Sequence, residues 1–333
     1  MAIEIFKDSN IVDVCVAAAR KENIDSNVAE EANKLIRELA ATPNPHNRYQ
    51  IAQLVGFAVN EITRPQLTWL NQVADVKNVA FGDKAQFKTR LEGIRAFVQA
   101  KGATTPRSKV ANKTVSIETI DVSARPVVNR VELQNGLVNM ADLINDASYQ
   151  MELKYNAYVQ NALATAAATW AAPYYGTGVG LVKATLDPMI YHWMRMGGKA
   201  SILGDIGELA KLAELTGFNA AAGTLQFSPE IINEQNAAGF IGTYVGSNVM
   251  QLVNPPIDGT DTPTYSTKDL YILPTAADAS MRPLKVVFEG DLQSMDAENI
   301  DDLTYEVRLD QYFGVGVAYG DRPYMGVYHD STP

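Results

Sequence analysis

A long run of apolar residues at helical spacing most constrains what this chain can fold into. Apolar positions recur three and four residues apart before and through a segment rich in tyrosine and alanine: Leu133, Leu137, Met140, Ile144, Ala147, Met151, Tyr155, Tyr158 and Ala162. A helix of about thirty residues is about 45–50 Å long. A compact chain of 333 residues has a radius of gyration of only about 20 Å. The helix would cross most of the molecule, which predicts an elongated or plate-like body.

The segment before this helix differs in charge from the rest of the chain. Residues 77–130 hold 11 Lys and Arg and 4 Asp and Glu, whereas the whole chain has a net charge of −10. The segment is therefore +7 and the remainder −17. Two strand-like runs, 86–99 and 114–128, flank a turn at 101–108. A two-stranded ribbon with few large apolar residues builds no core of its own, so we expect it to lie on another surface.

The other segments predict an α+β protein with no internal repeat. Before the ribbon, amphipathic helical stripes begin near residues 11, 28 and 51; Pro43 and Pro45 end the second, and the third ends before Pro65. After the long helix we expect a glycine loop at 176–180, and a helix that Asp187 and Pro188 begin. Further helices are expected at 206–215 and 228–235, and strands at 240–244, 249–253 (about a turn at 246–248), 269–273, 284–288 and 304–319.

Composition excludes several classes of protein. The chain is 47% hydrophobic and 20% charged, which excludes wholesale disorder. Its single cysteine, Cys15, excludes an intramolecular disulfide framework, and three scattered histidines argue against a metal centre. An acidic chain is also a poor candidate for tight nucleic-acid binding. Residues 155–182 are uncharged, but Pro173 and three glycines interrupt them, so we expect no membrane span, no signal peptide and a reducing cytoplasm.

Candidate chemical motifs are weak. Gly176–Gly180 superficially resembles a nucleotide-binding loop, but a long helix rather than a strand precedes it, which favours a structural loop. His192 lies between two aromatic residues, and we expect a hydrogen-bonded, partly buried imidazole. An acidic cluster near the C-terminus favours a solvated turn or a docking face over a cation site; its members are Asp291, Asp296, Glu298, Asp301 and Asp302. The sequence predicts no cofactor, no metal and no enzymatic activity.

The order of these segments resembles the tailed-phage major capsid protein of the Hong Kong 97-like fold, which encapsulin shells share. The resemblance covers residues 65–329. Three stretches support it: 201–205 (Ser-Ile-Leu-Gly-Asp) and 239–246 resemble the A-domain of the family, and 305–316 resembles the closing strands of its P-domain. The resemblance implies a helical N-terminal arm at 1–76, an extended E-loop at 77–131, a P-domain with the spine helix at 132–185 and 275–333, and an A-domain at 186–274.

The implied function is self-assembly. Such a protein forms hexamers and pentamers of an icosahedral head that encloses double-stranded DNA, in a virion assembled in the host cytoplasm. Its partners would be copies of itself, scaffolding, portal and decoration proteins, and DNA through non-specific contacts. A +7 ribbon on a −17 body is complementary to the next copy of the chain, a contact that closes into rings or shells. The expected contact residues are Lys88, Arg90, Arg95, Arg107, Lys109 and Lys113.

Two features of some family members are not expected here. Some join an E-loop lysine covalently to an asparagine of a neighbour. Lys101, Lys109 and Lys113 lie near the ribbon tip, but nothing identifies the acceptor or the acid, so we expect no cross-link. Other members begin with a cleaved scaffolding segment. The short helices at the start of this chain predict an uncleaved arm, with scaffolding from a separate protein or from none.

Two alternatives remain open at this point. One is an encapsulin-type compartment, which has the same shell but an enzyme cargo. The other is a cytoplasmic α/β enzyme that uses the loop at Gly176–Gly180. Gel filtration separates the second from a shell protein, because an enzyme would elute as a small oligomer.

Overall fold

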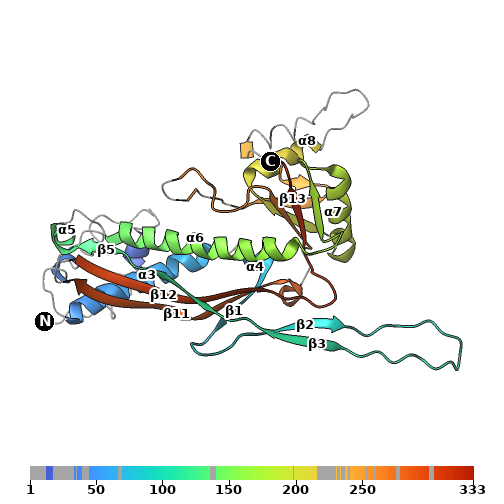
Figure 1. Cartoon of the computed structure of the whole chain (residues 1–333), viewed down its shortest axis with the longest axis horizontal. Helices are drawn as coiled ribbons and strands as arrows, with labels where there is room; N and C mark the ends of the chain where they lie inside the picture. The colour runs from blue at the N-terminus through green and yellow to red at the C-terminus, as the bar shows by residue number, and fades with distance from the viewer. Residues whose placement is uncertain are drawn as a thin grey trace.

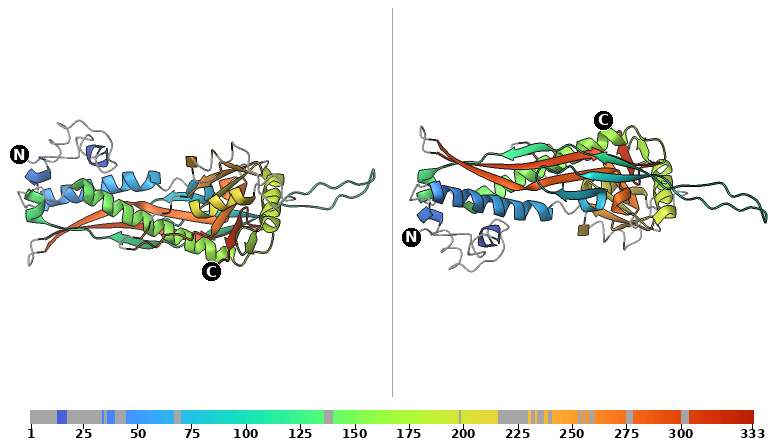
Figure 2. Two further views of the ribbon diagram at one scale, coloured as in Figure 1. Left: turned by 90° about the horizontal axis from the view of Figure 1, so that it is seen from above. Right: turned by 90° about the horizontal axis from the view of Figure 1, so that it is seen from below.

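A computed structural model describes residues 13–17, 34, 36–39, 45–66, 70–135, 140–197, 199–215, 230, 233, 237–238, 241–252, 254, 256–257, 260–274, 278–299 and 304–333. The molecule is elongated, as the long helix predicts (Figure 1). A narrow body holds a long sheet and its helices, a smaller block lies at one end, and a thin ribbon extends beyond that block (Figures 1 and 2).

The body is a five-stranded sheet covered by helices on one face. Its strand order is β1-β11-β12-β4, and β5 also pairs with β12. The strands are β1 (Ala74–Val79), β4 (Ile120–Ala124), β5 (Val127–Asn129), β11 (Leu284–Asn299) and β12 (Thr304–Val317). The helices are α3 (Pro45–Gln66), α4 (Leu70–Val73), α5 (Arg130–Asn135) and α6 (Met140–Ala167).

The core of the body forms where α3 and α6 lie along β11 and β12. Tyr155 of α6 packs on Phe313 of β12 with ring centroids 4.8 Å apart, and Phe288 of β11 lies 5.0 Å from the same ring. Residues two apart on β12, Tyr305, Val307 and Leu309, are buried in this core, as expected where one face of a sheet is covered. Their register on one face holds the long helix parallel to the strands.

The long helix and α3 differ from expectation at their ends. The apolar stripe that begins at Leu133 covers α5 and α6, and residues 136–139 between them lie outside the described part; α6 has 28 residues, a rod of about 42 Å. Pro45 begins α3 instead of only ending the helix before it, because the first turn of a helix needs no proline N–H. α3 also continues past Pro65 to Gln66. Burial of its apolar stripe outweighs one lost hydrogen bond near its end.

The ribbon begins as two antiparallel strands, β2 (Gln86–Glu92) and β3 (Ala111–Ser116). The expected runs 86–99 and 114–128 are therefore wrong in two ways. β2 ends at Glu92, and the second run breaks into β3, β4 and β5. β4 and β5 pair with β12 rather than with β2, because the open edge of β12 supplies hydrogen-bond partners that the short ribbon cannot.

The smaller block is a six-stranded sheet with two helices. Its strand order is β6-β13-β10-β7-β9-β8. The strands are β6 (Tyr175–Gly178), β7 (Ala200–Gly204), β8 (Thr243–Tyr244), β9 (Ser247–Gln251), β10 (Asp269–Pro274) and β13 (Gly326–Asp330), and the helices are α7 (Lys183–Gly197) and α8 (Ile206–Leu215). The 3-10 turn η4 (Ala279–Met281) lies instead against β1 and β2.

The central strand β10 is buried on both faces. Leu270 and Ile272 belong to the core under α7 and α8, whereas Tyr271 and Leu273 belong to the core of the body. Because successive side chains of a strand point to opposite faces, β10 joins the block to the body. β7 and β13 do the same, since Leu203 and Val327 belong to the core of the body.

Several expectations for the block are confirmed and others are wrong. α8 spans the predicted 206–215. α7, however, begins at Lys183, because Asp187 is not a cap: its carboxylate accepts a hydrogen bond from the Tyr244 hydroxyl at 2.8 Å. The glycine loop is in part a strand, β6, which pairs with β13.

The turn before β9 lies one residue earlier than expected, at Val245 and Gly246, both with positive φ. β11 runs to Asn299 rather than Phe288, since it stays paired with β12. The helix expected at 228–235 lies largely outside the described residues.

Candidate assembly surface

The first arm of the ribbon is fixed to the body at Phe87. This side chain is fully buried and packs with Ala85 and Val287. Two ammonium groups lie over its ring: Lys77 Nζ is 4.6 Å and Lys285 Nζ is 5.6 Å from the centroid. Such contacts stabilise more when they are desolvated, so Phe87 fixes the point where β2 leaves the body.

We call the part of the ribbon that joins the body its root. Lys285 is the most unusual residue of this root. Its side chain is 0% exposed, and its Nζ lies 3.1 Å from Asp75 Oδ2 and donates to the Ser280 carbonyl at 2.8 Å. Burial lowers its pKa, which the neighbouring Asp75 opposes. Asp75 and Lys285 are direct partners in the parallel register of β1 and β11. Sequence analysis missed this pair, and its only signal was one charge within the apolar run 284–288.

The second arm of the ribbon is fixed by a close approach to β12. A Cβ on Gly314 would lie 2.7 Å from the Glu118 carbonyl oxygen, and one on Gly316 would lie 3.1 Å from Ile117. Glu289 of β11 accepts hydrogen bonds from the Gly82 amide, at 2.9 Å, and from the Thr119 hydroxyl. These two bonds lower the pKa of Glu289. Both arms therefore leave the body at fixed points.

Beyond residue 95 the ribbon packs against no other described element. Large apolar side chains are exposed at its root, where Ile94 is 74% and Leu91 39% exposed, and farther out, at Phe97 (43%), Val98 and Val110. Figure 1 shows this part extending away from every other element. Contiguous exposed apolar residues in a soluble chain mark an interaction surface.

The predicted contact residues all lie on this ribbon, but not on one face. Lys88 is on one face of β2, whereas Lys113 is opposite Thr89 on the other face. Lys88, Arg95, Arg107, Lys109 and Lys113 are exposed, and the side chain of Arg90 is not among those described. Their part in assembly stays a prediction.

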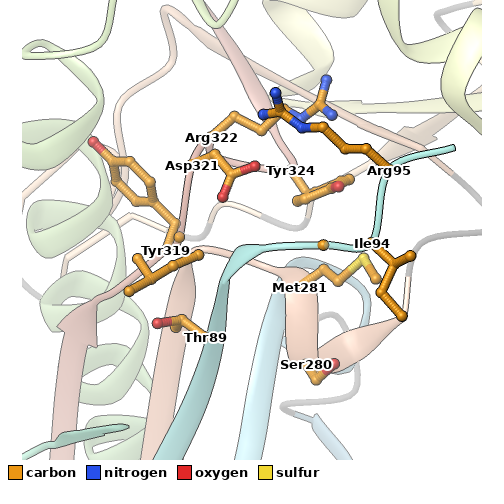
Figure 3. A pocket seen from close by; sticks show the side chains of 12 residues that line it. Thr89, Ile94, Arg95, Ser280, Met281, Tyr319, Asp321, Arg322 and Tyr324 are labelled. Carbon is orange, nitrogen blue, oxygen red and sulfur yellow. The ribbon is translucent and has the colours of Figure 1, made fainter. Parts of the chain in front are cut away.

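A hollow of about 360 Å³ lies at the root, between the end of β2, η4 and the β12–β13 connection. Figure 3 shows Arg95 on one side and Arg322 on the other. Arg322 is a residue that sequence analysis missed, because nothing near it in the chain points to the ribbon.

The features considered for enzyme chemistry have structural roles. Asp330 accepts a hydrogen bond from the Gly180 amide and pairs with Lys211 Nζ at 2.7 Å, which joins the former glycine loop to the C-terminal strand. His192 is not hydrogen-bonded as expected: its Nε2 has no partner in the described part of the chain, and its ring packs edge-on to Tyr174 and Trp193. Burial, Arg322 and Arg195 lower its pKa.

The acidic cluster is only partly described. Asp291 and Asp296 lie on β11, and Asp296 Oδ2 is 3.9 Å from Arg48 Nε; residues 301 and 302 lie outside the described part. Within the described ranges, no group of three or more His, Cys, Asp or Glu could hold a metal ion. No described helix is both long enough and apolar enough to cross a bilayer. The Cys15 thiol is buried, which raises its pKa to about 11.

The fold is that of phage capsids. The mature capsid protein of bacteriophage PhiM1 is 14% identical, with a TM-score of 0.53 over 79% of this chain and 87% of that chain. Mycobacterium phage Cain is 15% identical, with a TM-score of 0.53 over 79% and 91%. The capsid of an empty GTA particle is 13% identical, with a TM-score of 0.52 over 78% and 88%. The chain thus has the Hong Kong 97-like capsid fold, as the resemblance implied.

Sequence similarity identifies the protein family to which the chain belongs. The family model described as "SPbeta prophage-derived putative capsid protein YonB" matches residues 4–329, and no curated protein matches the chain. The chain belongs to this capsid protein family. It is a major capsid protein, a structural component of the phage head and virion that associates with further subunits, and the enzyme alternative is wrong.

Proposed function

We propose that this capsid protein assembles through hexamers and pentamers into an icosahedral head of a tailed phage that encloses double-stranded DNA. One observation carries the proposal. The ribbon is held rigidly at its root by Phe87 and Gly314, yet its distal half exposes both apolar and basic side chains. Such a surface is completed by the body of a neighbouring subunit.

Each expected domain has a separate role in assembly. In this proposal the arm at 1–76 ties subunits together and the E-loop at 77–131 lies over a neighbour. The P-domain at 132–185 and 275–333 carries the spine helix, and the A-domain at 186–274 packs around the symmetry axis. β1 (Ala74–Val79) spans the boundary between the first two parts, so the arm is anchored in the body sheet.

Other partners follow from charge and from the class of protein. Packaged DNA touches the shell only non-specifically, because a body of −17 repels phosphate. Scaffolding, portal and decoration proteins are further partners, and assembly takes place in the host cytoplasm. An encapsulin-type compartment differs in its contents, which would be protein rather than nuclease-protected DNA.

The test reverses the charge of the ribbon. We expect the quadruple variant Lys88→Glu, Arg90→Glu, Arg95→Glu and Arg107→Glu to give a folded subunit that does not assemble, because each exposed ion pair contributes only about 0–1 kcal/mol but several act together. Negative-stain microscopy and light scattering measure the particles, and circular dichroism measures folding.

The matched control changes the net charge by the same amount elsewhere. Its four substitutions are Lys34→Glu, Lys154→Glu, Lys183→Glu and Lys199→Glu, all at exposed residues off the ribbon. Normal particles from the ribbon variant, or equal failure of both variants, would contradict a specific role of the ribbon.

A further inference from the structure

The hollow at the ribbon root is polar and open to one side of the molecule. It is lined from three separate parts of the chain: five ribbon residues, the last of them Ile94 and Arg95, then Ser280 and Met281 of η4, and the β12–β13 connection at 319–322 with Tyr324. Because the ribbon leaves the body here, the hollow exists only when the root is seated. It therefore differs from the distal ribbon in position and in shape.

Two guanidinium groups lie at this hollow, and no carboxylate of the described residues pairs with either of them. Figure 3 shows Arg95 and Arg322 reaching toward one another from opposite sides. Neither guanidinium forms an ion pair or a side-chain hydrogen bond with the described part of the chain; Arg322 lies over the Tyr324 ring at 5.6 Å. Among the lining residues whose side chains are described, Asp321 is the single carboxylate, and it pairs with neither arginine.

The positive field extends beyond the hollow. Burial lowers the pKa of His192 on α7, and the charges of Arg322 and Arg195 lower it further. A group of arginines with one unpaired carboxylate is net positive, and the planar guanidinium binds carboxylates and phosphates in bidentate geometry. The hollow therefore fits an anionic group that the subunit itself does not supply.

From this geometry we propose that the hollow binds carboxylate side chains of a second copy of this chain, an inference that rests on the proposed function and names a partner for Arg95. The candidate carboxylates are Glu132, Asp142 and Asp146. All three are exposed, and none has a partner among the described residues. They lie on α5 and the first turns of α6, at the end of the body opposite the ribbon (Figure 1).

This placement has a consequence for symmetry. Complementary charges at the two ends of an elongated subunit produce a heterologous contact, in which each copy offers a different surface to its two neighbours. Such contacts close into rings rather than dimers, as a shell requires. A phosphate ligand would use the same two arginines, and the experiment distinguishes it.

The test introduces amines in place of the arginines. Arg95→Lys and Arg322→Lys keep the charge, and a zero-length carbodiimide then joins an amine to a contacting carboxylate. Particles are assembled from mixed ¹⁴N and ¹⁵N subunits so that links between copies differ in mass. We expect mixed-isotope links from position 95 or 322 to Glu132, Asp142 or Asp146 in particles, and none in free subunits. The native Lys199 serves as the control amine.

A charge swap provides the second measurement. We expect Arg95→Glu with Arg322→Glu to lower the particle yield at least tenfold relative to the control Lys183→Glu with Lys199→Glu. Adding Glu132→Lys and Asp142→Lys should restore part of the yield.

Three results would overturn the proposal: particles without these links, equal yields from both double variants, or normal particles that merely retain less DNA, which indicates a phosphate site. Absence of particles from the wild-type chain would instead contradict the proposed function itself.

Discussion

Gly314 and Gly316 decide how closely the second ribbon arm can approach β12. Both are on the same strand, but the atoms that face them differ. Gly314 faces the rigid backbone carbonyl of Glu118, whereas Gly316 faces the movable end of the Ile117 side chain. A methyl group is tolerated where its neighbour can shift and is not where the neighbour is backbone.

We therefore expect Gly314→Ala to destabilise the free subunit by about 1–3 kcal/mol. The matched variant Gly316→Ala should cost less than about 1 kcal/mol, because Ile117 can change rotamer. Urea unfolding of both variants, made in the assembly-deficient background, measures the difference in the free energy of unfolding. Equal losses would show that the close backbone contact at Gly314 does not hold the arm.

At the scale of elements, the ribbon combines a rigid root with an unsupported tip. β2 and β3 are short, and β4 and β5 join the sheet of the body through β12. A lone hairpin of this length is marginal in water. The root is therefore stabilised by the body, whereas the distal half would be stabilised by contact with a second subunit.

Substitution of one phenylalanine at the root and of one in the distal half distinguishes the stability of the subunit from its assembly. Phe87 is fully buried and Phe97 is 43% exposed. Phe87→Ala should destabilise the subunit by about 3–5 kcal/mol and speed hydrogen exchange in β2 and β3. Phe97→Ala should change subunit stability by less than about 0.5 kcal/mol yet reduce particle yield. Thermal unfolding with exchange mass spectrometry tests the first, and light scattering tests the second. A Phe97→Ala chain that assembles normally would contradict the distal contact.

For the whole molecule, the opposed charges of ribbon and body predict how assembly responds to salt. The Debye length falls from about 10 Å at 0.1 M salt to about 3 Å at 1 M. Screening weakens the attraction between a +7 ribbon and a −17 body, whereas apolar contacts are not weakened by it.

We expect raising NaCl from 0.1 to 1 M to increase the subunit concentration needed for assembly about tenfold, which corresponds to losing about 1.4 kcal/mol per contact. Light scattering across a concentration series measures this value. The ribbon charge-reversal variant, which should not assemble at 0.1 M NaCl, supplies the control: added salt should not weaken its assembly further and, by screening the introduced repulsion, should favour it. A wild-type response of the opposite sign would show that apolar burial alone drives assembly.

Local sequence patterns predicted the elements whose apolar side chains form a stripe on one face. α8 matched because its apolar stripe and the flanking glycine are both local signals. β6 was missed because its partner β13 lies about 150 residues away in the chain. Arg322 and Lys285 were missed for the same reason.

By itself, the sequence determined the class of fold, the order of its parts, the basic ribbon and the acidic body, since these follow from composition and from periodic spacing along the chain. Only the tertiary structure decided where the ribbon is seated and what surrounds it. The Asp75–Lys285 pair, the approach of Gly314 to Glu118 and the hollow between Arg95 and Arg322 each join residues far apart in the chain. Their energies depend on distances that no local pattern encodes.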